Sequence, residues 1–230
     1  MFIRTNAYKD KEPIETKQLI LLAKKLLPDV VFNMASLENN PFTFPEVQTL
    51  LEGITVGGHK LSDHQQILDL QDSWSYVFNS VNTSNFTIDK EMCNKINKIV
   101  AQNEALVAGQ FRYGQVSING SDYCPPMPDE LDTIFDEELS IIRNRCTTNV
   151  ELAMEVFIFI ALNQFYFDGN KRTGRLMANG ILLSSGQGFL NIKAKDKLEF
   201  NTLMLELYND ENHNADNLCN FLYNKCINRY

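Results

Sequence analysis

The residues best suited to chemistry lie in one stretch, Phe165 to Arg175, whose sequence is Phe-Tyr-Phe-Asp-Gly-Asn-Lys-Arg-Thr-Gly-Arg. A tight turn that feeds a helix N-terminus leaves several backbone N–H groups unpaired and pointing the same way, which favours phosphate. Gly169 permits the close backbone approach that a side chain would block. Arg172 and Arg175 share a helix face and can reach the same phosphates. Asp168 supplies an oxygen ligand for Mg²⁺, which binds through one or two carboxylates plus the phosphates.

The elements on either side must position this turn. Residues Leu152 to Phe165 are apolar on nearly every side, and a helix that is apolar all round is buried at the centre of its domain. Thr148, with Glu151 three residues later, has the spacing of a capping box and begins this helix. A second helix is predicted from Lys171 to about Leu183. Together they form a rigid wall behind a phosphate pocket.

The rest of the chain is predicted to be nearly all α, with one small β-hairpin. Between Gln110 and Tyr123, apolar residues alternate from Phe111 to Ile118 and are followed by Asn119-Gly120, a pattern typical of a hairpin. Apolar spacing and capping signals predict the other helices, which are Thr16–Leu27 ending at Pro28, Pro45–Glu52 capped by Thr43, a long helix from the Ser62-x-x-Gln65 box through Phe78, Thr87–Gln102, Asp129–Arg145, and a C-terminal region including 203–207 and 218–227.

Composition limits the class of protein. The 230 residues carry 29 acidic and 21 basic side chains, a formal charge of -8, and no basic cluster, which argues against a nucleic-acid partner. No apolar run is long enough to span a bilayer, and the opening segment is too short and too polar to form the core of a signal peptide. We therefore expect a cytoplasmic protein without a membrane partner. Its five scattered cysteines are expected to be reduced thiols, namely Cys93, Cys124, Cys146, Cys219 and Cys226.

Residues 168–175 resemble the motif of the Fic family, His-x-Phe-x-Asp/Glu-Gly-Asn-Gly/Lys-Arg-x-x-Arg. The matching positions are Asp168, Gly169, Asn170, Lys171, Arg172 and Arg175, with Thr173 and Gly174 between the two arginines. The resemblance implies a helical fold and the transfer of AMP from ATP to a Ser, Thr or Tyr hydroxyl of a target protein. It also implies that Asp168 holds Mg²⁺, that the turn and Arg172 hold phosphates, and that Arg175 orients the terminal phosphate. Lys171 is also a feature of the related Doc-type toxins, which transfer a phosphate.

The resemblance extends over roughly residues 25–190. Glu38 and Asn39 are similar to the end of the family's inhibitory helix, although Met34 stands where that helix has Ser or Thr. This implies that Glu38 pairs with Arg175 and opposes productive ATP binding. The hairpin resembles the family's flap, which registers a target peptide, and the flap residues are Arg112, Tyr113, Gly114, Gln115 and Val116. We expect a single domain, with an inhibitory segment over about 1–60, a Fic core over about 61–190 and C-terminal helices over about 191–230.

One departure from the motif concerns catalysis. Gln164 occupies the position of the family's histidine, with Phe165 and Tyr166 in place of the usual proline and phenylalanine. An amide cannot accept a proton at neutral pH, and a positioned general base contributes about 10²–10⁴ in rate. Transfer is therefore expected to be weak or absent. The three histidines, His59, His64 and His213, lie far away along the chain.

Several readings of the sequence remain open. The chain is a Fic-type enzyme or a descendant of one, a pseudoenzyme that binds a partner protein with the exposed edge of its flap, or a Doc-like phosphotransferase. Gln164 can also orient a water, as glutamine does in GTPases, which would allow slow nucleotide hydrolysis. A purely structural helical protein would leave Arg172, Arg175 and Glu38 without a common purpose.

Overall fold

The apolar segment that follows Thr148 forms α7 (Asn149–Asn163), and nearly all of its residues are buried. The Thr148 hydroxyl accepts a hydrogen bond from the Glu151 backbone N–H at 3.2 Å and caps the helix as predicted. The next helix, α8 (Asn170–Ser184), packs directly on α7. Gly174 permits this contact, because a Cβ at that position would lie 3.0 Å from the Phe157 carbonyl oxygen.

The computed structural model describes residues 1–229, and these form ten α-helices and one two-stranded antiparallel sheet. This agrees with the predicted all-α class. The other eight helices are α1 (Thr16–Lys25), α2 (Leu27–Leu37), α3 (Phe44–Leu51), α4 (Leu61–Asn82), α5 (Lys90–Ala101), α6 (Leu131–Arg145), α9 (Lys197–Asn209) and α10 (Asp216–Phe221). Short 3₁₀ turns cover Pro128–Glu130 and Ala194–Asp196, and a π-helical turn covers Leu222–Cys226.

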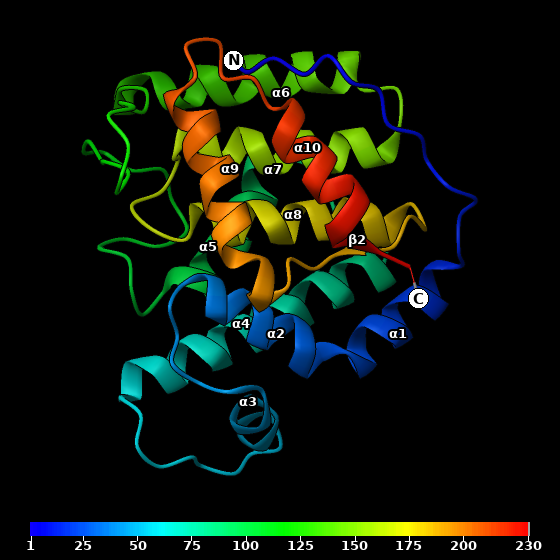
Figure 1. Ribbon diagram of the computed structural model, residues 1–230, viewed down its shortest axis with the longest axis vertical. Helices are drawn as coiled ribbons and strands as arrows, with labels where there is room; N and C mark the ends of the chain where they lie inside the picture. The colour runs from blue at the N-terminus through cyan, green and yellow to red at the C-terminus, as the bar shows by residue number, and fades with distance from the viewer. Residues whose placement is uncertain (230) are drawn as a thin grey trace.

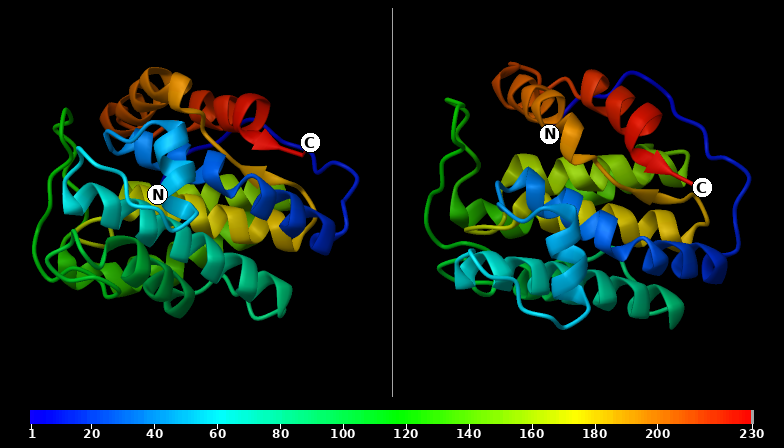
Figure 2. Two further views of the ribbon diagram at one scale, coloured as in Figure 1. Left: turned by 90° about the horizontal axis from the view of Figure 1, so that it is seen from below. Right: turned by 60° about the horizontal axis from the view of Figure 1, so that its bottom comes forward.

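The two helices that flank the candidate turn occupy the centre of the bundle (Figure 1). α8 packs on α7, α5 and α4, and α2 packs on α4. Both views in Figure 2 show the green segment between α5 and α6 as a loop at one end of the bundle. Within residues 1–229, no helix combines the length and the apolar character needed to cross a membrane.

The strands are not where the sequence placed them. β1 (Phe189–Leu190) pairs with β2 (Ile227–Asn228), whereas residues 110–123 contain no strand. An isolated two-stranded ribbon is marginal in water. Here the alternating apolar side chains pack on other elements instead, as Phe111 does by stacking on Phe165 at 4.8 Å between ring centroids. The predicted hairpin is therefore wrong in its pairing, although the segment does form an extended loop that turns at 118–121.

Two helix boundaries also differ from those predicted. The first helix ends at Lys25, and Pro28 lies in the first turn of α2, where its missing N–H leaves no bond unmade. The predicted box at Ser62 is wrong, since α4 begins at Leu61 and the Asp63 carboxylate accepts from the Lys60 backbone N–H at 3.1 Å. Aspartate at this position serves the capping role that the sequence reading gave to a glutamine.

Candidate functional site

The site begins where α7 ends. Gln164 has a left-handed backbone with φ of 49°, and Gly169 has φ of 75° just before α8. Between them, the Asn170 side chain closes the turn by accepting from the Tyr166 N–H at 2.9 Å and donating to the Tyr166 carbonyl at 2.8 Å. The first N–H groups of α8, from Asn170 to Arg172, have no acceptor within the helix. The local fold thus presents backbone donors at a helix N-terminus, which is an arrangement suited to an anion.

A buried asparagine on α5 holds this turn from behind. The Asn97 amide donates to the Asp168 carbonyl at 3.0 Å and to the Thr173 hydroxyl at 3.2 Å. Its oxygen accepts from the Gly109 N–H at 2.9 Å, at the start of the loop before α6. One side chain therefore links the turn, α8 and that loop, and its role was not evident from the sequence.

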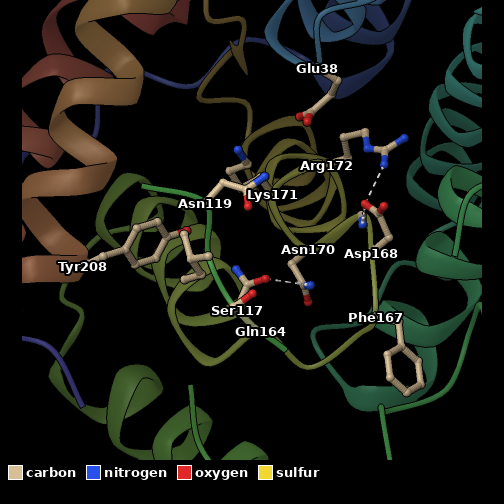
Figure 3. A pocket seen from close by; sticks show the side chains of 12 residues that line it. Glu38, Ser117, Asn119, Gln164, Phe167, Asp168, Asn170, Lys171, Arg172 and Tyr208 are labelled. Carbon is tan, nitrogen blue, oxygen red and sulfur yellow. Dashed lines mark hydrogen bonds and ion pairs between the residues drawn. The ribbon is translucent and has the colours of Figure 1, made fainter. Parts of the chain in front are cut away.

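An open pocket of about 300 Å³ lies in front of the turn (Figure 3). Segments far apart in the chain meet there: the end of α2, the loop before α6, the α7–α8 turn and α9. Its lining consists of Glu38, Ser117, Ile118, Asn119, Gln164, Phe167, Asp168, Gly169, Asn170, Lys171, Arg172 and Tyr208. The structure therefore brings together the predicted glutamate, the glutamine and most of the predicted phosphate-binding residues.

The Gln164 side chain is held in place at both ends. Its Nε2 donates to the Ala161 carbonyl at 2.6 Å, and its Oε1 accepts from Asn170 Nδ2 at 3.1 Å, a contact drawn in Figure 3. The Tyr208 hydroxyl donates to the same Ala161 carbonyl at 3.2 Å. Burial raises the pKa of the Tyr208 hydroxyl, which therefore stays protonated at neutral pH. Neither side chain provides a proton acceptor comparable to an imidazole.

None of the three histidines, all of which lie within residues 1–229, lines this pocket. His59, between α3 and α4, and His64, in the first turn of α4, pack against Phe42 at 4.0 and 4.9 Å between ring centroids. His213 packs edge-on against Tyr123 at 4.8 Å and contacts the Leu207 carbonyl. Folding therefore does not bring a substitute imidazole to Gln164.

The two motif arginines face carboxylates from distant segments. Arg172, which is 2% exposed, forms a two-point ion pair with Glu104 at 3.0 and 2.6 Å and contacts Asp168 at 3.0 Å. Burial lowers the pKa of Arg172, but the attraction of Glu38, Glu104 and Asp168 outweighs it and raises the pKa above its ordinary value. This guanidinium is thus firmly charged, and both of its terminal nitrogens are engaged with the protein.

Arg175 contacts Glu38, with 2.7 Å between Nη2 and Oε1. Burial raises the pKa of the Glu38 carboxyl, but the attraction of Arg175, followed by that of Arg172 and Lys171, lowers it below its ordinary value. Burial also lowers the pKa of Arg175, yet an arginine starts so high that it stays protonated. The pair is therefore ionic at neutral pH.

The position of Glu38 follows from the way α2 ends. Asn39 adopts a left-handed backbone with φ of 65° just after Glu38. Lys197, at the start of α9, donates to the Ser36 carbonyl at 2.6 Å and to the Asn39 side chain at 2.7 Å. Asn40 donates to the Asp63 carbonyl of α4 at 3.0 Å. The helix that carries Glu38 is thus anchored to two other helices.

Three predicted phosphate-binding residues, Thr173, Gly174 and Arg175, do not line the pocket. The Thr173 side chain is fully buried against Asn97, and Gly174 faces Phe157 on α7. Successive residues of a helix point in directions about 100° apart, so residues inside one motif face different neighbours. The structure gives Thr173 and Gly174 a packing role. Arg175 is likewise buried and reaches the site only through Glu38.

The predicted flap residues also require a correction. Arg112 is 2% exposed, and its guanidinium donates to the Gln164, Gly114 and Pro126 carbonyls and to the Gln115 side chain. It therefore fastens the loop to the end of α7, and four of its five N–H donors are used within the protein. Tyr113 is 66% exposed and packs edge-on against Phe167, while Val116 is half-buried. The loop residues that line the pocket are the next three, 117–119.

Sequence reasoning missed several residues of the site, namely Asn97, Glu104, Ser117, Ile118, Asn119, Phe167 and Tyr208. Glu104 and Tyr208 lie 68 and 36 positions from Arg172, and no local spacing connects them to the motif. Phe167 lies inside the motif, but its side chain direction depends on the turn geometry. Only the folded chain places these groups around one pocket.

The donor set is compatible with Mg²⁺ only when phosphates are bound. Among residues 1–229, no group of three or more His, Cys, Asp or Glu is placed to hold a metal. The Asp168 side chain is 50% exposed, and its hydrogen bonds with Gly169 and Arg172 all involve Oδ1. Oδ2 remains for a cation that takes most of its ligands from water and phosphate.

The fold and the site define a class of protein in which a buried helix, a glycine turn and an arginine-bearing helix form an anion-binding pocket. Residues 87–182 match the family model described as the Fic/DOC family. Solved Fic-domain structures have the same fold, including a signaling protein from Bacteroides thetaiotaomicron (TM-score 0.76, 18% identity, 92% of this chain and 87% of that chain). Another is Fic-1 from C. elegans (TM-score 0.67, 16% identity, 90% and 68%). Residues 87–182 thus match the Fic/DOC family model, and the chain has the fold of solved Fic-domain structures.

A curated relative shows the same relationship in sequence. The protein adenylyltransferase Fic of Nematostella vectensis is 24% identical over 193 residues, which is 80% of this chain and 43% of that protein. The chain spans 43% of this relative's length, and 32% of the protein of the same name from Aedes aegypti. The name of these relatives describes transfer of an adenylyl group to protein.

Proposed function

We propose that this protein binds the phosphates of an adenine nucleotide at the start of α8, and that its transfer of AMP to a protein hydroxyl is weak or absent. The observation that carries this proposal is the identity and state of Gln164. It stands in the pocket beside Asn170 and Asp168, with both ends of its amide hydrogen-bonded to the protein. Binding and catalysis are therefore separated in this site.

The binding half of the proposal rests on the donors around the pocket. The backbone N–H groups of α8, Lys171 and the two arginines supply positive charge for phosphates, and Asp168 supplies an oxygen for Mg²⁺. Glu38 occupies Arg175 and so competes with the terminal phosphate of ATP. The protein alternates between the Glu38-bound form and a nucleotide-bound form.

The catalytic half rests on the amide at position 164, where the family motif has an imidazole, and the Asp168 carboxylate is assigned to Mg²⁺. The attacking hydroxyl of a target must lose its proton, and an amide cannot take it. No histidine lines the pocket, and the Tyr208 hydroxyl stays protonated. We therefore expect the chain to keep the nucleotide-binding site of the adenylyltransferase relatives and to transfer the adenylyl group slowly or not at all. Lys171 leaves open a Doc-like reaction, which the same missing base would slow.

The loop at residues 110–119 supports a second candidate function, capture of a partner protein. It is extended and has no partner strand among residues 1–229, so its main chain can add an extended peptide by backbone hydrogen bonds. Ser117 and Asn119 would place that peptide at the pocket mouth. In this role the protein is a pseudoenzyme of the cytoplasm whose nucleotide site regulates binding.

Nucleotide binding is tested by calorimetric titration with ATP and Mg²⁺. The Glu38→Gly variant, which lacks the competing carboxylate, is expected to bind ATP. Adding Arg172→Ala should weaken that binding at least about tenfold, because it leaves the Glu104 and Asp168 carboxylates without their counter-ion beside the bound phosphates. Arg143→Ala, which removes an exposed arginine on α6, serves as the control and should leave binding unchanged. Equal affinities with and without Arg172 would show that the site is misplaced.

A further inference from the structure

Glu104 is a second carboxylate at the phosphate site, and it comes from a part of the chain that the motif does not include. It lies in the turn that follows α5, where its backbone N–H donates to the Ala101 carbonyl at 3.1 Å. Gln66 on α4 donates to its Oε1 at 2.8 Å. The Glu104 side chain is 24% exposed, and its contact with the pocket is through Arg172.

This carboxylate takes up the donors of Arg172. Arg172 Nη1 donates to the Val100 carbonyl at 3.2 Å and to Glu104 Oε1 at 3.0 Å. Its Nη2 donates to Glu104 Oε2 at 2.6 Å and to Asp168 Oδ1 at 3.0 Å. Each terminal nitrogen carries two hydrogens, so these four bonds use them all. A phosphate can reach the end of Arg172 only by displacing Glu104 or Asp168.

The backbone N–H donors at the start of α8, unlike the terminal nitrogens of Arg172, are not used by hydrogen bonds within their helix. The N–H groups of Asn170, Lys171 and Arg172 lie in the first turn of α8 and have no acceptor within the helix. The pocket is lined by these residues, and Lys171 adds a side-chain cation. One phosphate group can bind here without breaking either ion pair.

The charges around the pocket also favour one phosphate group over several. Three carboxylates, on Glu38, Glu104 and Asp168, oppose three cations, on Lys171, Arg172 and Arg175. The ion pairs of these carboxylates involve only the two arginines, so Lys171 and the helix N-terminus are left to balance much of the charge of a single phosphate. Each further phosphate adds negative charge next to carboxylates that already occupy the arginines, and such repulsion is weakly screened near buried groups.

We propose that Glu104 is a specificity-determining residue that, together with Glu38, limits the resting site to one phosphate group, so that a nucleoside monophosphate binds more tightly than a triphosphate. This inference rests on the proposed function, since it assumes that a nucleotide binds in this pocket. Releasing Glu38 alone frees Arg175 and leaves Arg172 engaged. Full acceptance of a triphosphate requires displacement of both glutamates.

Calorimetric titrations with AMP and with ATP, each with Mg²⁺, test the proposal on the whole chain. The natural protein should bind AMP more tightly than ATP. Glu104→Gln should tighten ATP binding roughly 10- to 100-fold, the loss of one charged competitor for Arg172, and should leave AMP binding within about twofold. Adding Glu38→Gln should tighten ATP further. The control is Glu91→Gln, which removes an exposed carboxylate from α5 and should change neither affinity.

The possible results separate the two proposals. If ATP binds more tightly than AMP and Glu104→Gln leaves both affinities unchanged, the role of Glu104 is refuted while the nucleotide site stands. If no variant binds either nucleotide, both proposals are refuted. Where Glu104→Gln is poorly folded by circular dichroism, Gln66→Leu provides the second variant. It removes the hydrogen bond that holds Glu104 without touching Arg172, and it should tighten ATP in the same direction.

Discussion

A histidine at position 164, combined with Glu38→Gly, is expected to raise the rate of AMP transfer or self-modification by about 10²–10⁴, the usual contribution of a positioned general base. The position accepts this residue, because histidine is among the side chains that tolerate the left-handed backbone seen at Gln164. The new imidazole would stand in the pocket next to Asn170 and Asp168. Phe165 and Tyr166 are buried where the family motif has proline and phenylalanine. We therefore expect the increase in transfer rate to lie toward the lower end of this range.

The measurement is the initial rate of covalent labelling from ATP with Mg²⁺, using saturating nucleotide so that binding does not limit the rate. Glu38→Gly with Gln164→Asn is the matched control, since it changes the same position and keeps an amide. Equal rates for the histidine and asparagine variants would show that the base at position 164 is not what limits transfer.

Loss of Glu38 is expected to destabilise the nucleotide-free protein by about 3 kcal/mol, near the lower end for a broken buried ion pair. Arg175 is 2% exposed, and within residues 1–229 its Nε and Nη1 have no hydrogen-bond partner. Removing Glu38 would therefore leave a buried charge with no direct partner. The effect stops short of the full range because the Glu38 side chain is 19% exposed.

The pH dependence of this effect has a definite sign. The pKa of Glu38 is depressed in the folded protein, so its stabilisation is fully present above the ordinary value of 4.5 and is lost as the pH falls through the depressed pKa. Urea unfolding of the natural protein and of Glu38→Gln should thus differ near neutral pH and converge in acid. Glu38→Leu with Arg175→Met, which replaces both charges, should recover most of the loss. A constant difference across the pH range would contradict the assignment.

Much of the fold followed from local patterns in the sequence. The apolar run after Thr148 predicted a buried helix, because no face of it suits water, and α7 is buried on nearly every side. The Asp-Gly turn and the helix after it also formed as expected. The alternation of apolar residues near Phe111 led to the wrong prediction of a hairpin. Alternating burial arises wherever an extended chain lies on a core, with or without a partner strand.

The candidate site divides in the same way. Chain connectivity places the residues of one turn together, such as Asp168 and Arg172, so the sequence was enough to predict that they share a site. Glu104 reaches Arg172 from the end of another helix, and that contact depends on how α5 packs on α8. Arg112 was assigned to a target-binding flap because its segment resembles that of the family, yet here backbone carbonyls satisfy it in the interior. Such long-range contacts have no local signature.

The most direct measurement of the central claim is the fate of α-labelled ATP on the Glu38→Gly protein that still carries Gln164. The protein is incubated with label and Mg²⁺ and passed through a desalting column, and the retained label is counted before and after denaturation. We predict that label is retained by the folded protein in proportion to its concentration and that denaturation releases it. Label that survives denaturation would show that transfer proceeds with Gln164 in place and would contradict the account.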